Sequence, residues 1–221
     1  MNKLNHIAFI MDGNGRWGVK KGKGRNFGHL QGIETVKKIV VTSINLKIPV
    51  VTFYVFSSEN WKRPKKEINF LFKLIRSYFS KEIENIIKQG IRINIFGDTH
   101  RLSTNIKSSF KDAMNLTRKN KKILVNLAIN YGSKNEILNA AKKTKNFKTL
   151  KNFEKNLHTK NLPNPDFLIR TGGHKRLSNF IMYNLTYTEL FFTDTLWPDF
   201  TTSEFENIIE KYFKIKRNYG L

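Results

Sequence analysis

The segment from Val50 to Phe56, VVTFYVF, constrains the fold of this 221-residue chain more than any other. It carries no charge, and apolar or aromatic side chains occur at both its odd and its even positions. A strand that is apolar on both faces is typical of the interior of a parallel sheet, which other elements cover on both sides. The segment therefore predicts an α/β fold with Val50 to Phe56 near the centre of the sheet.

Shorter apolar segments alternate along the chain with segments of helical periodicity. The other predicted strands are Leu4–Met11, Ile91–Phe96, Ile123–Ile129, Asp166–Arg170 and Leu190–Phe192. The predicted helices cover about Gly28–Leu46, Ile68–Ile87, Ser103–Arg118, Ser133–Lys145 and Ser203–Lys214. Since parallel strands need crossover connections, this order predicts a mainly parallel sheet flanked by helices, in a single domain over residues 1–221.

Composition limits the class of protein. Hydrophobic residues make up 39% of the chain and include 18 Phe, which is sufficient for one full hydrophobic core. There is no cysteine, which excludes disulfides and thiolate metal sites and is typical of cytoplasmic proteins. Because the sequence also has no apolar run of membrane-spanning length and no signal-peptide pattern, we expect a cytoplasmic location.

The formal net charge of +23 allows two interpretations. A strongly basic protein can bind a polyanion, such as nucleic acid, an anionic membrane surface or a phosphorylated substrate. Alternatively, the lysines reflect compositional bias and solubility, since they are scattered along the chain. The arginines are more informative than the lysines because five of them fall in predicted loops: Arg16, Arg25, Arg63, Arg170 and Arg176.

Polar clusters follow four of the predicted strands. They are Asp12–Trp17, Ser57–Arg63, Gly97–Arg101 and Arg170–Ser178. Ligands of open parallel sheets bind beyond the carboxyl ends of the strands, so these clusters predict one shared site. The third cluster is better explained as a capping turn.

The first cluster combines groups that suit a metal ion and a diphosphate. Asp12 can hold a divalent cation, Gly13 and Gly15 let backbone N–H groups approach an anion, and Arg16 offers a planar fork of donors. Arg25 lies in a flexible basic segment, and His29 at the start of the next helix is a candidate phosphate donor. The alternative is a turn with a helix cap, in which these residues bind no ligand.

Two later clusters offer further anion donors. Ser57, Ser58 and Asn60 can donate neutral hydrogen bonds, while Trp61 supplies an apolar wall beside Arg63. Arg170, a pair of glycines, Arg176 and Ser178 can surround one diphosphate. The alternatives are a helix-initiating loop for the former cluster and a plain surface loop for the latter.

With these clusters the chain resembles the cis-prenyltransferases, and in particular the bacterial undecaprenyl diphosphate synthases. The matching stretches span nearly the whole chain in the family's order: His6–Trp17, Phe27–His29, Phe56–Pro64, Phe96–Asp98, Asn130–Gly132, Asp166–Gly173, Leu177–Phe180 and Glu189–Phe200.

This resemblance implies a six-stranded sheet, a hydrophobic tunnel and a homodimer. It implies Mg²⁺-dependent condensation of isopentenyl diphosphate onto an allylic primer such as farnesyl diphosphate, giving undecaprenyl diphosphate, a lipid carrier for cell-wall synthesis. The helix Ile68–Ile87 would form a tunnel wall, with Phe70, Phe72 and Phe79 as candidates for limiting chain length. Peripheral contact with a membrane during product release is compatible with this activity.

The resemblance also implies roles for individual residues. Asp12 would be the catalytic, Mg²⁺-binding carboxylate, Glu189 a second metal ligand, and Asn60 the residue to which a proton-acceptor role is assigned. Because a neutral amide is very weakly basic, we prefer Asn60 as a group that orients a diphosphate oxygen or water for this proton. The implied substrate-binding residues are Gly13, Asn14, Gly15, Arg16, Trp17, Arg25, His29, Ser57, Ser58, Glu59, Trp61, Arg63, Arg170, Arg176, Leu177 and Ser178.

Two positions depart from the family pattern, and other functions remain open. His174 stands where an acidic residue is common, and the tail Arg217–Gly220 keeps only the outer Arg and Gly of the motif that would reach the partner's active site. The alternatives are a family member with another product length, a catalytically inactive scaffold, and a basic nucleic-acid-binding protein. We disfavour the last because the arginines gather with glycines and Asp12 at strand ends.

Overall fold

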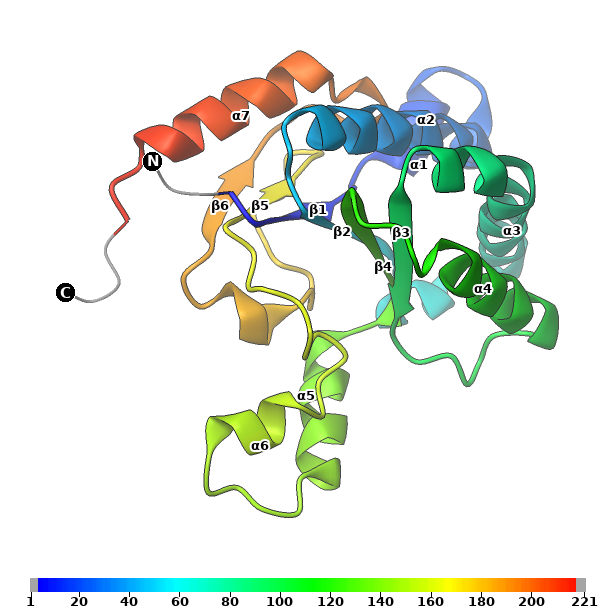
Figure 1. Ribbon diagram of the computed structural model, residues 1–221. Helices are drawn as coiled ribbons and strands as arrows, with labels where there is room; N and C mark the ends of the chain where they lie inside the picture. Colours follow the sequence, from blue (N-terminus) through cyan, green and yellow to red (C-terminus); the bar gives the residue numbers. More distant parts are fainter. Residues whose placement is uncertain (1–3, 218–221) are drawn as a thin grey trace.

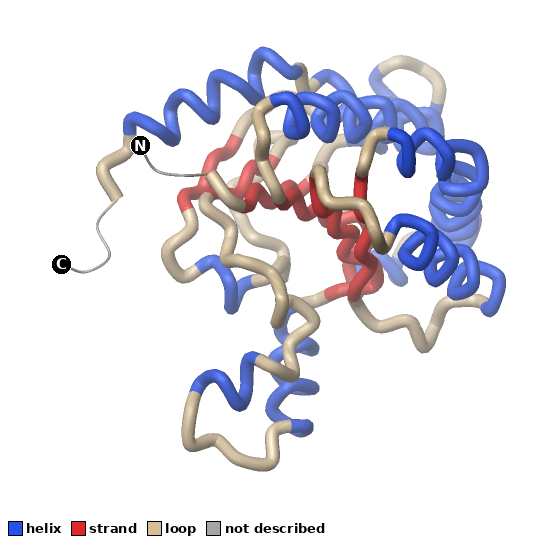
Figure 2. Tube along the Cα trace, in the orientation of Figure 1, coloured by secondary structure: helices blue, strands red, loops and turns tan. Residues whose placement is uncertain are grey.

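Six strands form one sheet in the order β3-β4-β2-β1-β5-β6, and every neighbouring pair is parallel (Figure 2). The computed structural model describes residues 4–217. The strands are β1 (His6–Ile10), β2 (Val50–Ser57), β3 (Ile91–Phe96), β4 (Ile123–Tyr131), β5 (Phe167–Arg170) and β6 (Glu189–Phe192). The predicted α/β fold is confirmed, with all strands parallel and Val50 to Phe56 inside the sheet.

Alternate side chains of each strand face two different cores. Ile7 and Phe9 of β1 pack into the larger core, to which α2 (Gly24–Asn45), α3 (Lys65–Lys88), α4 (Thr104–Thr117) and α7 (Thr202–Lys214) contribute. Ala8 and Ile10 face the smaller core, which the segment around Phe180 covers. α5 (Ser133–Lys143) and α6 (Leu150–Glu154) project from the body of the molecule (Figure 1).

The glycine-rich start of the chain is more regular than the sequence predicts. Residues expected to form loops instead form α1 (Asn14–Lys20) and the first turn of α2. A Cβ atom on Gly28 would lie 1.8 Å from the carbonyl oxygen of Asn14, and one on Gly18 would lie 2.1 Å from that of Gly24. These glycines therefore allow α1 and α2 to touch, and His29 lies in the second turn of α2 and not at its start.

Short 3-10 helices occupy other predicted loops. They are η1 (Ser58–Lys62), η2 (Met182–Leu185) and η3 (Trp197–Asp199). Of the helices within residues 4–217, none is long and apolar enough to cross a membrane.

The strand order places three of the four polar clusters side by side. Asp12, Ser57 and Arg170 lie at the carboxyl ends of the adjacent strands β1, β2 and β5. The Gly97–Arg101 cluster follows β3, which β4 and β2 separate from β1. There Asp98 Oδ1 accepts a hydrogen bond from the His100 amide at 2.9 Å, as in the capping turn that the sequence suggests.

Candidate active site

A cavity of about 950 Å³ opens at the carboxyl edge of β1, β2 and β5. Fifteen of the residues proposed from the sequence line it: Asp12, Gly13, Asn14, Gly15, Arg16, Arg25, His29, Ser57, Glu59, Asn60, Arg63, Arg170, Arg176, Leu177 and Ser178. Segments far apart in the sequence thus converge on a single polar, basic cavity.

Two arginines hold the Asp12 carboxylate. Oδ2 accepts a hydrogen bond from Arg170 Nη2 at 2.9 Å, and Oδ1 accepts one from Arg16 Nη2 at 3.2 Å. Arg16 also donates to the carbonyl of Gly172 at 2.6 Å. Gly172 has φ 83° and approaches Arg16 so closely that a Cβ atom would lie 2.5 Å from Nη2. The Arg16 guanidinium is therefore held between the Asp12 carboxylate and the Gly172 carbonyl.

The Arg170 guanidinium is buried beneath the loop that follows it. Its side chain is 4% exposed, and Nη1 donates to Ser178 Oγ at 2.6 Å and to the carbonyl of Arg176. Its Nε atom is buried and has no hydrogen-bond partner within the described residues. An unpaired donor of a buried cation is costly, so this guanidinium depends on its bonds to Asp12, Ser178 and the Arg176 carbonyl.

Glu67, in the first turn of α3, organises a second basic group. Its carboxylate accepts hydrogen bonds from Arg25 at 2.9 and 3.2 Å, from His29 at 3.1 Å and from Arg63 at 3.1 Å. Burial raises the pKa of Glu67, but the hydrogen bonds from Arg25 and His29 outweigh it and lower the pKa overall. Glu67 is therefore ionised and keeps three donors at the rim of the cavity.

His29 is neutral in this arrangement. Burial lowers its pKa more than the neighbouring Glu67 raises it, and Arg63 and Arg25 lower it further. A neutral imidazole that donates through Nε2 to Glu67 leaves Nδ1 without a proton. His29 is thus better suited to supporting Glu67 than to binding a phosphate oxygen directly.

The end of β2 presents Ser57 to the cavity, and η1 presents Glu59 and Asn60. Asn60 Oδ1 accepts a hydrogen bond from the Ser57 amide at 3.1 Å. Burial raises the pKa of Glu59, but hydrogen bonds from Asn179 and Ser58 outweigh it, so the pKa is lowered overall. The structure therefore gives Asn60 a defined orientation at the start of η1 and keeps Glu59 ionised.

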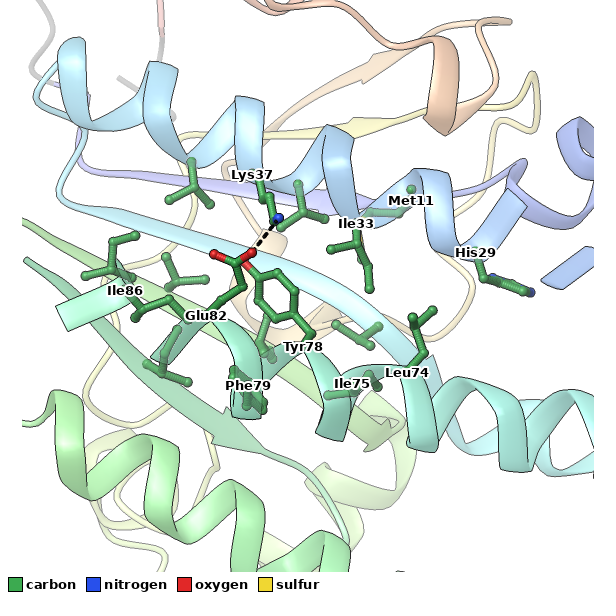
Figure 3. A pocket seen from close by; sticks show the side chains of 18 of the residues that line it. Met11, His29, Ile33, Lys37, Leu74, Ile75, Tyr78, Phe79, Glu82 and Ile86 are labelled. Atoms are coloured by element: carbon green, nitrogen blue, oxygen red, sulfur yellow. Dashed lines mark hydrogen bonds and ion pairs between the residues drawn. The ribbon is translucent and has the colours of Figure 1, made fainter. Parts of the chain in front are cut away.

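A second, apolar cavity of about 330 Å³ adjoins the first. It lies between α2 and α3, above strands β2, β3 and β4 (Figure 3). Both cavities share five lining residues: Met11, Asn14, His29, Val55 and Leu71. The polar cavity therefore continues into an apolar one, as the predicted tunnel requires.

One ion pair crosses the wall of this apolar cavity. Lys37 of α2 lies 3.0 Å from Glu82 of α3 and 3.2 Å from Glu34, and its ammonium stands 5.3 Å from the centre of the Tyr78 ring (Figure 3). Burial lowers the pKa of Lys37, but the two carboxylates outweigh it and raise the pKa overall. The pair joins the two helices partway along the cavity, between Ile33 and Ile86.

Three aromatic or polar residues proposed from the sequence do not line the polar cavity. Trp17 is 9% exposed, stacks on Phe27 and donates through Nε1 to Asp199 at 2.7 Å, because α1 turns its indole toward η3. Trp61 packs on Phe56 and Phe72 and lines a separate pocket with Phe72. Ser58 donates to Glu59 at 3.1 Å and borders a small pocket elsewhere.

The sequence leaves open which of the three candidate phenylalanines of α3 face the apolar cavity. Phe79 lines the apolar cavity, whereas Phe72 belongs to the pocket beside Trp61, and Phe70 lines neither. The helix itself is a wall of the apolar cavity, as predicted, through Leu71, Leu74, Ile75, Tyr78, Phe79, Glu82 and Ile86.

Glu189 is not near Asp12. It pairs in register with Phe167, whereas Arg170, at the other end of β5, pairs with Ile10. Three residues of strand separate these two positions by about 10 Å. Oxygen atoms that bind one Mg²⁺ ion each lie only about 2.1 Å from it. Within one copy of the chain, the two carboxylates therefore do not converge on one position, and the role of Glu189 as a second metal ligand stays a prediction. Glu189 instead lies 3.9 Å from Arg217, and the tail residues 218–220 fall outside the described residues.

Several cavity residues were not identified from the sequence. Tyr54, Lys134, Asn179 and Met182 line the polar cavity, and Glu67 holds its arginines. Tyr54 comes from a strand that seemed wholly apolar and stacks on Phe180 in the smaller core, while Lys134 and Met182 come from distant elements. Glu67 had no signal in the sequence, because the predicted helix begins at Ile68, whereas α3 begins at Lys65 and Arg63 lies before it.

The donor set at Asp12 fits a Mg²⁺ ion that arrives with a diphosphate. No group of three His, Cys, Asp or Glu side chains in residues 4–217 could hold a metal by itself. Mg²⁺ is commonly bound through one or two carboxylates, substrate phosphates and water, and Asp12 supplies one such carboxylate. The site therefore suits a metal that is completed by its substrate.

Comparisons with known proteins agree with this geometry. The family model described as "Putative undecaprenyl diphosphate synthase" matches residues 10–220. The isoprenyl transferase of Oceanobacillus iheyensis is 42% identical, covering 99% of this chain and 91% of its own. A Buchnera aphidicola relative, named ditrans,polycis-undecaprenyl-diphosphate synthase ((2E,6E)-farnesyl-diphosphate specific), is 41% identical, covering 98% of this chain and 91% of its own.

Solved structures show the same fold. A probable undecaprenyl diphosphate synthase from Campylobacter jejuni superposes with a TM-score of 0.86 at 33% identity and full coverage of both chains. Lavandulyl diphosphate synthase from Lavandula x intermedia, solved in complex with dimethylallyl diphosphate, superposes with a TM-score of 0.93 at 30% identity, covering 98% of each chain.

Proposed function

Because the chain belongs to the undecaprenyl diphosphate synthase family of prenyltransferases, we propose that it extends an allylic diphosphate with isopentenyl diphosphate units. The primer is farnesyl diphosphate, and the product is undecaprenyl diphosphate, used as a lipid carrier for cell-wall synthesis. The product length and the primer follow from the name of the Buchnera relative, and the allylic chemistry also from the ligand of the Lavandula structure.

One observation carries this proposal: a basic cavity and an apolar cavity share a wall. An allylic diphosphate has a highly charged head and an apolar chain, which need opposite environments. The arginines around Asp12 and Glu67 suit the head, and the groove between α2 and α3 suits the chain. A growing chain can enter the apolar cavity while its reacting end stays near Asp12.

The two basic groups suggest one site for each substrate. The allylic diphosphate would bind to Arg16 and to the basic residues held by Glu67, which are Arg25 and Arg63 with His29. These residues lie at the end of the polar cavity that borders the apolar cavity. Arg170, Arg176 and Ser178 would bind isopentenyl diphosphate. The position of these three residues together in the lining of the polar cavity supports an anion at this second position.

Catalysis then depends on stabilising charge as the allylic carbon–oxygen bond breaks. Asp12 would hold the Mg²⁺ ion, which supplies positive charge to the leaving diphosphate when bound. Arg16 and Arg25 would donate charged hydrogen bonds to the same diphosphate, and these strengthen as negative charge develops on it. The double bond of isopentenyl diphosphate then attacks the allylic carbon, forming one carbon–carbon bond.

The reaction ends with loss of a proton from the isopentenyl unit. An amide is a very weak base, so Asn60 is unsuited to accept the proton itself. Its Oδ1 already accepts a hydrogen bond from the Ser57 amide, so its NH₂ group can orient a diphosphate oxygen or a water. That oxygen would take the proton.

The active form is a homodimer, and contact with a membrane would let the insoluble product leave. These two points rest on the resemblance and on the chemistry of the product.

A direct assay tests the proposed reaction. The purified chain is incubated with farnesyl diphosphate, labelled isopentenyl diphosphate and Mg²⁺, and the products are separated by length. We expect a polyprenyl diphosphate of undecaprenyl length, and none when Mg²⁺ is chelated. No incorporation of label would refute the prenyltransferase proposal, whereas another chain length would refute only the proposed product.

A further inference from the structure

Three turns at the amino edge of the sheet form a basic surface opposite the active site. The turns lead into β2, β4 and β3, which are neighbours in the sheet (Figure 1). Hydrogen bonds join them: Leu124 donates to the carbonyl of Pro49 at 2.8 Å, Lys122 to that of Gly90 at 3.0 Å, and Asn120 to that of Ile91 at 2.7 Å. The ends of α2, α3 and α4 therefore meet at one surface.

Cations dominate this amino-edge surface. Its exposed basic residues are Lys47, Lys88, Arg92, Arg118, Lys119, Lys121 and Lys122. Within residues 4–217 none of these seven takes part in an ion pair, and Glu84 is the nearest acidic residue along α3. Their charge is thus available to an external anionic partner.

Exposed apolar side chains accompany these cations. Leu46 is 45% exposed at the end of α2, Ile87 is 38% exposed at the end of α3, and Leu116 is 56% exposed near the end of α4. A surface that combines several Lys or Arg with exposed aliphatic side chains fits the interface of an anionic lipid bilayer. Nucleic acid is less well matched because these aliphatic side chains offer it neither charge nor stacking.

The apolar cavity leads toward the same edge. Along α2 and α3 it runs from His29 and Leu74 past Ile33 and Ile75 to Ile86 (Figure 3). Its far end is lined by Val41, which is 42% exposed, and by Gln89, directly after Lys88. A chain that grows from the active site would therefore extend toward the amino-edge surface.

We propose that the amino-edge surface docks the enzyme on an anionic phospholipid bilayer, so that the far end of the apolar cavity faces the lipid. The identity of the apolar cargo rests on the proposed function, whereas the docking itself does not. Lysines bind the lipid phosphates, and Leu46 and Ile87 enter the interface. The product then reaches the hydrocarbon layer without crossing bulk water.

Vesicle binding in the absence of substrates tests this proposal. The probes are vesicles of equimolar phosphatidylglycerol and phosphatidylcholine, and vesicles of phosphatidylcholine alone. One variant carries Lys88→Glu, Lys119→Glu, Lys121→Glu and Lys122→Glu. A matched variant carries Lys142→Glu, Lys143→Glu, Lys145→Glu and Lys148→Glu on the exposed α5–α6 projection, with the same change in net charge.

We expect wild type to bind the anionic vesicles and not the neutral ones, with binding lost as salt increases. The amino-edge variant should bind at least about tenfold more weakly than wild type, and the matched variant within about threefold of wild type. The two variants have the same net charge, so a difference between them shows that binding depends on where the lysines lie. Replacing Leu46 and Ile87 together by Ser should also weaken binding at unchanged charge.

Three results would overturn the proposal: equal losses in the two charge variants, a larger loss in the α5–α6 variant, or single-stranded RNA binding the amino-edge surface in place of vesicles. Melting temperatures check that each variant folds. Chain elongation, assayed in detergent without vesicles, is expected to be unchanged in the amino-edge variant. A wild type that binds vesicles but does not elongate would refute the proposed function and leave the docking intact.

Discussion

Glu67 binds Arg25 through both carboxylate oxygens, with Oε2 2.9 Å from Nε and Oε1 3.2 Å from Nη2. The same carboxylate, 7% exposed, also accepts hydrogen bonds from His29 and Arg63. One acidic residue thus organises three basic residues at the junction of the polar and apolar cavities. Its role would be to position donors and not to contact the substrate.

Replacing Glu67 by Gln tests this positioning role. Because hydrogen bonds to charged groups contribute about 1–3 kcal/mol, the free energy of unfolding should fall by an amount in this range. The KM for the allylic diphosphate should rise more than the KM for isopentenyl diphosphate, since only the former is proposed to contact this group. Steady-state kinetics with each substrate varied in turn measure both constants.

Glu84→Gln is the matched control, because Glu84 lies exposed on the same helix. It should change neither constant. Equal effects of Glu67→Gln on both substrates would contradict the assignment of separate diphosphate sites.

Substitution inside the apolar cavity should shorten the product. Ile75 lines this cavity partway between His29 and Ile86, so Trp at this position would fill space that the growing chain needs (Figure 3). We expect Ile75→Trp to shift the products to shorter chains while the first condensation keeps its rate.

Leu30→Trp provides the comparison, since Leu30 is 49% exposed on α2 and lies outside the cavity. Its products should match those of wild type in length. An unchanged product distribution for Ile75→Trp would show that the chain does not occupy the groove between α2 and α3.

Strands and helices could be predicted because their residues follow simple periodic patterns. β3 has the predicted bounds, Ile91–Phe96, and β2 differs from the prediction only by including Ser57. α1 was missed because glycine is usually a sign of loops. At Gly18 and Gly28, however, glycine permits the close contact of two helices, which depends on tertiary structure that the sequence pattern does not contain.

The candidate site was predictable where its residues follow a strand, as Asp12 and Arg170 do. Residues that reach the cavity from helices, such as Lys134 and Met182, have no such signal. The tryptophans show the opposite error: Trp17 and Trp61 belong to motifs of the site, yet each packs away from the cavity.

The hydrogen bond between Trp17 and Asp199 leads to a prediction about stability. Trp17→Phe removes a donor that lies 2.7 Å from Asp199 Oδ1 but keeps the stacking on Phe27. The free energy of unfolding should fall by about 1 kcal/mol, the usual contribution of one such bond. Because Trp17 does not line the polar cavity, the KM values for both substrates should stay near those of wild type. A large rise in either KM would show that the indole contacts the substrate.

His6 should make stability depend on pH. Burial lowers the pKa of His6 to about 4, although a hydrogen bond to the Pro163 carbonyl and the charge of Asp166 oppose this shift. Below about pH 6.5, His6 is therefore protonated in the unfolded chain but stays neutral in the folded chain. This difference lowers the free energy of unfolding by about 2 kcal/mol between pH 7 and pH 5.

Urea unfolding at these two pH values measures this loss in wild type and in His6→Gln. The variant should lose about 2 kcal/mol less than wild type over the same interval. His29 and His158, whose pKa values burial also lowers, act equally in both proteins. The same loss in both proteins would contradict a neutral, buried His6.

The central claim is that the cavity around Asp12 is the place where prenyl transfer occurs. Incorporation of labelled isopentenyl diphosphate onto farnesyl diphosphate, compared between wild type and Asp12→Ala at equal melting temperature, tests it most directly. Loss of one group that stabilises developing charge lowers turnover by about 100-fold or more, and we expect that result here. An Asp12→Ala variant that elongates the primer at a rate within about threefold of wild type would place the reaction elsewhere and contradict the account.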